Sequence, residues 1–279
     1  NCAAKDQRAH GLFQFYGANR TGRWSSRMIQ LQNLPQNHMK DLSLARSMVE
    51  KGDYDLIEMC YDSIPNVLSE LIRTAFIAPE GKMFAVADFS AIEARVLSWL
   101  AQEKWRLDVF NTHGKIYEAS ASLMFGVPIE QVTKGSDLRQ RGKTAELALG
   151  YEGSVNAMEK MDKEKKLSKK EMYSIVALWR RANPKIVEFW AEVNEKAIEC
   201  VQTRKTKKVS CLVFEHDGTN LTIALPAGRK LYYRNPRVRP NRFGQIGIVY
   251  DGMVQSVGWT EVETYGGKLV ENIVQAISR

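Results

Sequence analysis

The feature that most constrains the fold of this chain is an apolar run that ends in a carboxylate and passes directly into a helical pattern. Met83 to Ala87 is apolar throughout and predicts a buried strand, and Asp88 follows it. Ser90 with Glu93 predicts a helix start with a capping box. Apolar residues then recur at helical spacing, at Ile92, Val96, Trp99 and Leu100.

A carboxylate at the end of a strand is well placed to hold Mg²⁺ against phosphate oxygens. Asp88 is therefore our first candidate metal ligand. An Asp before a Ser-capped helix is also ordinary turn chemistry, and Glu93 is equally explained as a capping partner.

A second helical pattern lies between Arg139 and Gly153. Arg139, Lys143, Leu147 and Tyr151 are four positions apart, which places them on one helix stripe with steps of about 6 Å. Two cations followed by an apolar and an aromatic residue match a nucleoside triphosphate lying along the helix, with phosphates at one end and base at the other. A solvated basic face that runs into a buried end gives the same pattern.

With both segments in this order, the chain resembles the polymerase domain of family A DNA polymerases over most of its length. Asp88 to Arg95 is similar to the family's motif A. The resemblance implies that Asp88 is catalytic and binds both Mg²⁺ ions, and that Glu93 packs against the sugar to exclude a 2′-hydroxyl. We also expect Arg95 to contact DNA.

Arg139 to Tyr151 is similar to motif B, which the family carries on its mobile fingers helix. This implies that Arg139 and Lys143 hold the triphosphate of the incoming dNTP. Leu147 would lie in the same nucleotide-binding stripe, and Tyr151 beside the templating base.

Two further segments are similar to family segments that contact the primer-template. Thr21 to Ser26 and Gln30 to Pro35 supply Arg23, Gln32 and Asn33, which donate and accept hydrogen bonds at phosphates, sugars and base edges. Glu271 to Ala276 resembles the helix before the family's third motif, which implies that Gln275 reads the minor groove of the new base pair.

The third motif itself, a His-Asp hairpin with the second metal-binding carboxylate, is expected after Gln275, and the sequence ends at Arg279. His216-Asp217 comes before Gln275, and its Asp-Gly step between two β-like runs predicts a hairpin turn instead. We therefore expect a truncated fragment, weakly active or inactive, that binds primer-template and dNTP. Its full-length parent would catalyse two-metal nucleotidyl transfer.

Some residues depart from the family pattern. Ala91 replaces a Gln, Leu147 replaces an aromatic residue, and Tyr151-Glu152-Gly153 is one residue longer than usual. These differences put sugar discrimination and the geometry beside the template base in doubt. We interpret them as signs of a phage or prophage branch.

The expected architecture is α/β (α+β), a polymerase palm with an inserted, mostly helical fingers subdomain. Residues 1–109 would form palm, 110–240 fingers and 241–279 the returning palm. Local patterns predict helices within Asp41–Phe76, Val109–Gly126 and Glu171–Thr203, the last broken at Asn183-Pro184. Val209–Tyr233 predicts short strands, and Arg234–Arg242 a basic loop.

Composition agrees with a DNA partner without establishing one. The chain has 279 residues, is 44% hydrophobic and carries a net charge of +8, which fits a polyanion partner. No apolar run approaches the roughly 18 residues of a membrane helix. No metal-ligand spacing links the four cysteines, Cys2, Cys60, Cys200 and Cys211, so we expect reduced thiols in a cytoplasmic protein. We also expect a monomer.

Three alternatives stay open at this point. A single-subunit RNA polymerase shares this plan, although Glu93 as a steric gate favours deoxynucleotides. The chain is also compatible with a non-catalytic DNA-binding module or with a helical scaffold with basic surfaces. In the last case, Asp88→Ala would change neither Mg²⁺ nor nucleotide binding.

Overall fold

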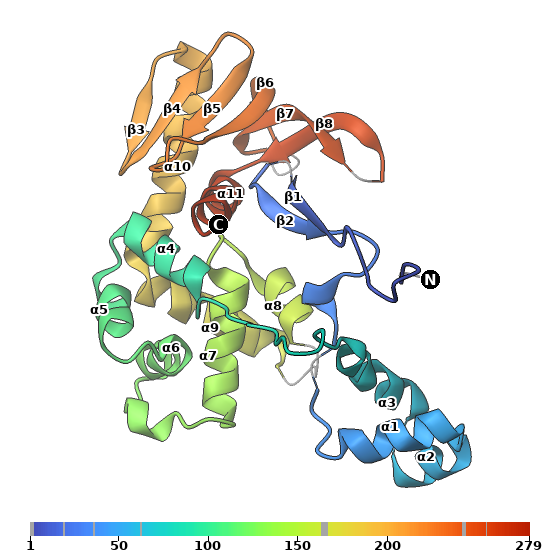
Figure 1. Cartoon of the computed structure of the whole chain (residues 1–279). Helices are drawn as coiled ribbons and strands as arrows, with labels where there is room; N and C mark the ends of the chain where they lie inside the picture. The colour runs from blue at the N-terminus through green and yellow to red at the C-terminus, as the bar shows by residue number, and fades with distance from the viewer. Residues whose placement is uncertain are drawn as a thin grey trace. The chain divides into compact units, whose positions relative to one another are not determined.

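The computed structural model describes residues 3–18, 20–35, 37–61, 63–162, 167–241, 244–254 and 256–279. The chain divides into two compact units (Figure 1). The smaller comprises Asn1–Ala18 and Trp24–Phe89, and the larger Asn19–Arg23 and Ser90–Arg279. Helices and antiparallel strands are both present, so the predicted α+β class is confirmed. The palm and fingers boundaries stay a prediction.

The smaller unit contains a two-stranded sheet and a helical cluster. β1 (Phe13–Ala18) pairs with β2 (Arg23–Ser26), and the short 3-10 helix η1 (Leu31–Asn33) follows. The predicted helices between Asp41 and Phe76 are confirmed as α1 (Leu42–Lys51), α2 (Tyr54–Cys60), α3 (Ile64–Leu71) and the 3-10 helix η2 (Ile72–Ala75). They bury a small core of Ala45, Met48, Ile57, Val67 and Leu71.

Residues 83–87 do not form the predicted buried strand. The side chains of Met83 and Val86 are 87% and 92% exposed, and the segment belongs to neither sheet. An apolar run becomes a strand only where a neighbouring strand takes its backbone hydrogen bonds and covers one face. Within the described residues no strand does so, and Asp88 follows an unpaired segment.

Most of the larger unit is helical. Its helices are α4 (Ile92–Ala101), α5 (Lys104–Thr112), α6 (Ile116–Phe125), α7 (Asp137–Leu149), α8 (Val155–Met161), α9 (Lys169–Ala182), α10 (Pro184–Thr203) and α11 (Gly266–Ile277), with the short η3 (Ile129–Gln131). The predicted break at Asn183-Pro184 is confirmed, since Asn183 ends α9 and Pro184 opens α10. Proline suits a first helical position because its missing N–H is not needed there.

The predicted capping box at the start of α4 is absent. Ala91 is the N-cap residue, with φ of 51°, and no side chain caps the helix. The carboxylate of Glu93 is bonded to other elements instead. The predicted apolar face is only partly right, because Leu100 is buried and Ile92 and Val96 are half-buried, while Trp99 is exposed.

Six antiparallel strands form the larger sheet in sequence order. They are β3 (Lys207–Val209), β4 (Leu212–His216), β5 (Asn220–Ala224), β6 (Lys230–Pro240), β7 (Ile246–Val254) and β8 (Gly258–Thr264). The hairpin turn predicted at His216-Asp217 is confirmed between β4 and β5. There the Asp217 carboxylate accepts hydrogen bonds from the backbone N–H groups of Thr219 and Asn220, at 2.9 and 2.7 Å.

The basic loop predicted from Arg234 is wrong, because β6 continues to Pro240. A register shift lies between Arg234 and Arg237, where Asn235 has φ of 48°. Such a bulge lets a strand with prolines keep its partner. Arg237 then pairs with Asp251 of β7 at 2.8 Å and with Glu261 of β8 at 2.6 Å. Arg242 lies outside the described residues.

One core joins the sheet to the helices of the larger unit. α10 packs along one face of the sheet, and α11 packs on both α10 and α4 (Figure 1). The start of α11 approaches very closely, because a Cβ at Gly266 would clash with the carbonyl of Trp190, and one at Gly267 with the carbonyl of Tyr151. Gly266 therefore brings α11 against α10, and Gly267 brings it against the residues that follow α7.

Candidate active site

Helix α7 is embedded on one side and open on the other. Ser136 caps it by accepting a hydrogen bond from the backbone N–H of Arg139, at 3.3 Å. Gly142, Thr144, Ala145, Ala148 and Leu149 face the interior. Leu147 is 51% exposed and Gln140 is also exposed. The open side of α7 therefore carries the exposed Gln140 and Leu147, with the half-buried Lys143 one turn before Leu147.

The two cations of the predicted stripe have different surroundings. Arg139 donates from Nε to Glu118 of α6 at 2.6 Å, and its guanidinium carbon lies 5.7 Å from the centre of the Tyr117 ring. Lys143 is half-buried and forms no ion pair or hydrogen bond with the described residues. Lys143 is therefore the cation of the pair whose charge is shared with none of the described residues.

Tyr151 does not lie on α7, because the helix ends at Leu149. The indole of Trp190 donates to the carbonyl of Gly150 at 3.1 Å, which fixes the chain just before Tyr151. The Tyr151 hydroxyl donates to Glu93 Oε2 at 3.3 Å. Burial, reinforced by the nearby charge of Glu93, raises the pKa of Tyr151 well above its ordinary value. Tyr151 is therefore a neutral hydrogen-bond donor.

Residues from three segments of the larger unit contact the carboxylate of Glu93. Besides Tyr151, its carboxylate accepts from Arg279 Nη2 at 3.2 Å and lies 4.0 Å from Arg23 Nη1. It also lies in the first turn of α4, where the helix dipole favours an anion. These contacts bring together three predicted residues, namely Arg23, Glu93 and Tyr151.

The turn just before Arg23 is held by two arginines that the sequence analysis did not identify. The Arg20 guanidinium lies 5.0 Å and 4.4 Å from the ring centres of Tyr233 and Tyr250. Arg229 donates to the carbonyl of Thr21 at 3.4 Å and also to the carbonyl of Ala276 at the end of α11. Nothing in the local sequence marks these contacts, since each joins segments far apart in the chain.

Gln275 lies on α11, as predicted, half-buried and with its amide donating to Glu271 at 3.2 Å. Arg95 contacts residues of the larger unit, to which it belongs. Its Nε donates to the carbonyl of Ser90 at 3.0 Å, and its guanidinium carbon lies 4.6 Å from the centre of the Phe110 ring. The DNA contacts predicted for Gln275 and Arg95 stay predictions.

Three predicted residues lie in the smaller unit. Gln32 accepts a hydrogen bond from Ser26 at 2.5 Å, and Asn33 donates to Gln30 at 2.8 Å. Asp88 is exposed and forms no hydrogen bond or ion pair with the described residues. Its carboxylate is available to a ligand, and its catalytic role stays a prediction.

The described residues hold no group of three or more His, Cys, Asp or Glu side chains arranged around a metal position. Cys60 and Cys211 are exposed free thiols and Cys200 is a buried one, while Cys2 lies outside the described residues. No helix in the described part of the chain is long and apolar enough to cross a membrane.

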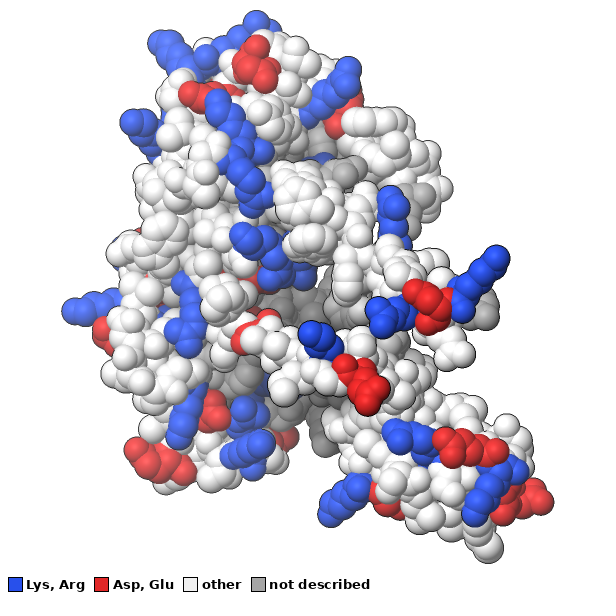
Figure 2. Space-filling view, viewed as in Figure 1, with Lys and Arg blue, Asp and Glu red and all other residues white. Residues whose placement is uncertain are grey.

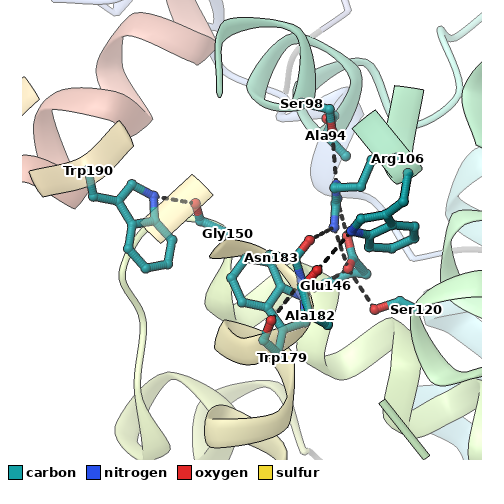
Figure 3. A network of polar contacts seen from close by, with 11 residues as sticks. Ala94, Ser98, Arg106, Ser120, Glu146, Gly150, Trp179, Ala182, Asn183 and Trp190 are labelled. Atoms are coloured by element: carbon teal, nitrogen blue, oxygen red, sulfur yellow. Dashed lines mark hydrogen bonds and ion pairs between the residues drawn. The ribbon is translucent and has the colours of Figure 1, made fainter. Parts of the chain in front are cut away.

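The buried carboxylate of Glu146, on α7, bonds to side chains of three other helices (Figure 3). The side chains of Glu146 and Arg106 are 3% and 1% exposed, and they are joined by two hydrogen bonds of 2.8 and 2.5 Å. Glu146 also accepts from the Ser120 hydroxyl at 2.9 Å and from the Trp179 indole at 2.8 Å. These contacts tie α7 to α5, α6 and α9.

Arg106 also forms two hydrogen bonds outside the ion pair. Nε donates to the Ser98 hydroxyl at 2.8 Å, and Nη1 to Asn183 Oδ1 at 3.0 Å. Trp179 stacks on Trp190, with ring centres 6.0 Å apart and planes at 10°. Additional hydrogen bonds of this kind help to offset the cost of burying an ion pair.

Charge alone does not locate a DNA path. Figure 2 shows Lys and Arg side chains spread over the visible face with Asp and Glu interspersed among them. Several cations are neutralised by ion pairs, such as Arg237 with Asp251 and Lys230 with Glu215. The contacts of individual cations such as Lys143 are therefore more informative about a binding site than the net charge is.

Comparison with known proteins gives the family. A sequence model described as DNA polymerase family A matches residues 1–216. Over 277 residues the chain is 53% identical to the DNA polymerase of Bacillus phage SP02, covering 98% of this chain and 43% of that protein. Over 119 residues it is 32% identical to the thermostable DNA polymerase I of Thermus aquaticus, covering 43% of this chain and 14% of that protein.

A solved structure has the same fold. It is the POL domain of Pol1 from M. smegmatis in complex with DNA primer-template and dNTP, with a TM-score of 0.53 at 20% identity, over 100% of this chain and 35% of that one. At this identity the likeness concerns the fold alone. The chain spans less than half the length of these relatives. Since the family model covers most of the chain and the phage relative matches nearly all of it, this chain belongs to DNA polymerase family A.

Proposed function

We propose that this chain forms the part of a template-directed DNA polymerase that binds the dNTP and the primer-template. The reaction is transfer of a nucleotide from the dNTP to the primer 3′-hydroxyl. The observation that carries the proposal is the surface of α7, where Lys143, which pairs with none of the described residues, lies one turn after Arg139 and one turn before the exposed Leu147.

In this proposal, Arg139 and Lys143 bind the triphosphate of the dNTP. A guanidinium offers a planar fork to phosphate oxygens, and an ammonium offers a compact charge. Leu147 contributes apolar surface one turn further along the helix. The phosphates therefore lie toward the start of α7 and the base toward its end.

Glu93 and Tyr151 form the wall next to the sugar and base. Tyr151 holds one carboxylate oxygen of Glu93 and Arg279 holds the other. A carboxylate fixed in this way excludes a 2′-hydroxyl, both by its volume and by its limited freedom to move. The pair thus favours deoxynucleotides over ribonucleotides.

In the larger unit, Arg23 and Gln275 contact the primer-template. For the smaller unit, considered by itself, we assign DNA contacts to Gln32 and Asn33. Arg23 opens β2 directly after the turn that Arg229 bonds to the end of α11, and Gln275 lies on α11 itself. Polar side chains of this kind contact phosphates, sugars and the minor groove with little dependence on base sequence.

Asp88 is the residue of this chain that we assign to a metal ion. Its exposed carboxylate, which pairs with no residue that the structure describes, suits Mg²⁺, which prefers oxygen ligands. When bound, Mg²⁺ neutralises phosphate charge and lowers the pKa of the attacking hydroxyl. The other contributions come from the protein, which orients the triphosphate through α7 and excludes the wrong sugar through Glu93.

The test is dNTP binding, measured by calorimetry on a primer-template whose primer ends in a dideoxynucleotide. Arg139→Met and Lys143→Met should each weaken binding about tenfold or more, the usual cost of losing a charged hydrogen bond. Arg141→Met is the matched control, because Arg141 lies on the same helix but is engaged by Asp137 and Glu171. Equal effects of all three variants would show that only net charge matters.

A further inference from the structure

Helices α6 and α7 approach closely because Gly142 has no side chain. A Cβ there would clash with the carbonyl oxygen of Tyr117 and meet the Cβ of Ala121 at 3.0 Å. This approach brings Glu118 of α6 within reach of Arg139 on α7. The side chains of Glu118 and Arg139 are only 14% and 26% exposed.

The contact uses one particular nitrogen of the guanidinium. Arg139 donates from Nε to Glu118 Oε1 at 2.6 Å, while the Tyr117 ring lies beside the same guanidinium. Neither Nη group forms a hydrogen bond with the described residues. The two Nη groups can donate two parallel hydrogen bonds to the oxygens of one phosphate.

Glu118 stays ionised in this position. Burial alone would raise its pKa, but the hydrogen bond from Arg139 and the attraction between the charges outweigh burial, and the pKa of Glu118 lies below its ordinary value. The carboxylate therefore holds Nε at neutral pH.

We propose that Glu118 is a positioning residue for triphosphate recognition: it fixes the orientation of Arg139 through Nε, so that both Nη groups face the phosphates. This inference rests on the proposed role of Arg139 in dNTP binding. The family resemblance assigns no role to Glu118, and the sequence between Glu118 and Arg139 gives no signal of the contact.

A carboxylate beside a triphosphate site has two opposing effects. It orders the arginine, which reduces the entropy lost on binding. Its negative charge also repels the phosphates. Two substitutions separate these effects. Glu118→Gln removes the charge but keeps an oxygen that accepts from Nε, whereas Glu118→Ala removes both. The difference between the two variants therefore reports orientation alone.

We expect Glu118→Ala to bind dNTP about 3- to 10-fold more weakly than Glu118→Gln, the range expected when one long side chain must be ordered on binding. Glu118→Gln should bind at least as tightly as the original chain. Binding is measured on the dideoxy-terminated primer-template used above. Melting temperatures of all variants show whether each is folded.

The matched control lies on α7 itself. Asp137 accepts from Arg141 Nε at 2.7 Å, which is the same kind of bond at a residue that the proposal does not place at the phosphates. Asp137→Ala and Asp137→Asn should bind dNTP equally well. In the Arg139→Met background, Glu118→Ala and Glu118→Gln should also become equal, because the residue through which Glu118 acts is gone.

Three results would overturn the inference while the original chain binds dNTP and Arg139→Met weakens that binding. These are equal binding by Glu118→Ala and Glu118→Gln, a difference that persists without Arg139, or the same difference at Asp137. If Arg139→Met binds dNTP normally, the proposed function of Arg139 and this inference fail together.

A second measurement needs no nucleotide. The NMR signal of the Arg139 Nε–H group should be protected from exchange with water in the original chain and in Glu118→Gln, and lost in Glu118→Ala. Absence of that protected signal from the original chain would overturn the orientation itself.

Discussion

Glu93 illustrates how one residue acquires a role that local sequence does not define. Its spacing from Ser90 predicts a capping box, but its carboxylate is used by Tyr151 and Arg279 instead. Both partners come from segments distant in the chain. The family resemblance predicts the importance of Glu93, whereas only the folded structure shows which side chains hold it.

The buried Tyr233 and the half-buried Tyr151 should control stability at high pH. Burial raises the pKa of Tyr233 to about 12, and burial with the charge of Glu93 also raises the pKa of Tyr151. Because these pKa values are higher in the folded state, the unfolded chain loses the protons first. The stabilisation is complete below about pH 10 and is lost as the pH rises toward 12.

Urea unfolding at a series of pH values from 9 to about 11 measures this loss. Tyr233→Phe should flatten the fall in unfolding free energy over that range. Tyr232→Phe changes the exposed neighbour and serves as the control. An unchanged pH dependence in Tyr233→Phe would contradict the assignment.

At the scale of elements, the structure separates what local chemistry determines from what packing determines. The hairpin at Asp217 and the break at Asn183-Pro184 are predicted from sequence, because turn and helix-start preferences act within a few residues. The strand expected at residues 83–87 and the loop expected from Arg234 are wrong. Both depend on whether another strand pairs with the segment, which no local pattern encodes.

The placement of α7 is the element-scale result that matters most for function. Sequence spacing predicts the stripe of Lys143 and Leu147, but Tyr151 falls beyond the helix end at Leu149. The orientation of that stripe depends on the buried pair of Arg106 and Glu146. Pattern analysis does not find this pair, because Arg106 and Glu146 lie far apart in the sequence. A buried Glu on the apolar side of a helix does indicate that a cation must lie nearby.

Breaking this pair should be costly. Arg106→Met leaves the Glu146 charge buried without its partner, and we expect a loss of about 3–5 kcal/mol of unfolding free energy. Arg141→Met, which removes a partly exposed ion pair from the same helix, should cost about 1 kcal/mol or less. Urea unfolding compares the two variants. A similar small loss for both would show that Arg106 and Glu146 do not hold α7.

At the scale of the whole molecule, the chain belongs to DNA polymerase family A and spans 43% of its phage relative. The predicted α+β class is confirmed. The division between the two units falls between Phe89 and Ser90, within the segment that resembles motif A. The site residues and the palm and fingers boundaries that the resemblance implies both stay predictions.

The central claim is that this chain binds primer-template and dNTP together, in a way that depends on the templating base. The most direct measurement is the affinity of a labelled, dideoxy-terminated primer-template in Mg²⁺ with each of the four dNTPs, repeated for each templating base. We predict that only the complementary dNTP tightens DNA binding, and that Lys143→Met abolishes this tightening. Equal tightening by all four dNTPs, or none by any of them, would contradict the claim.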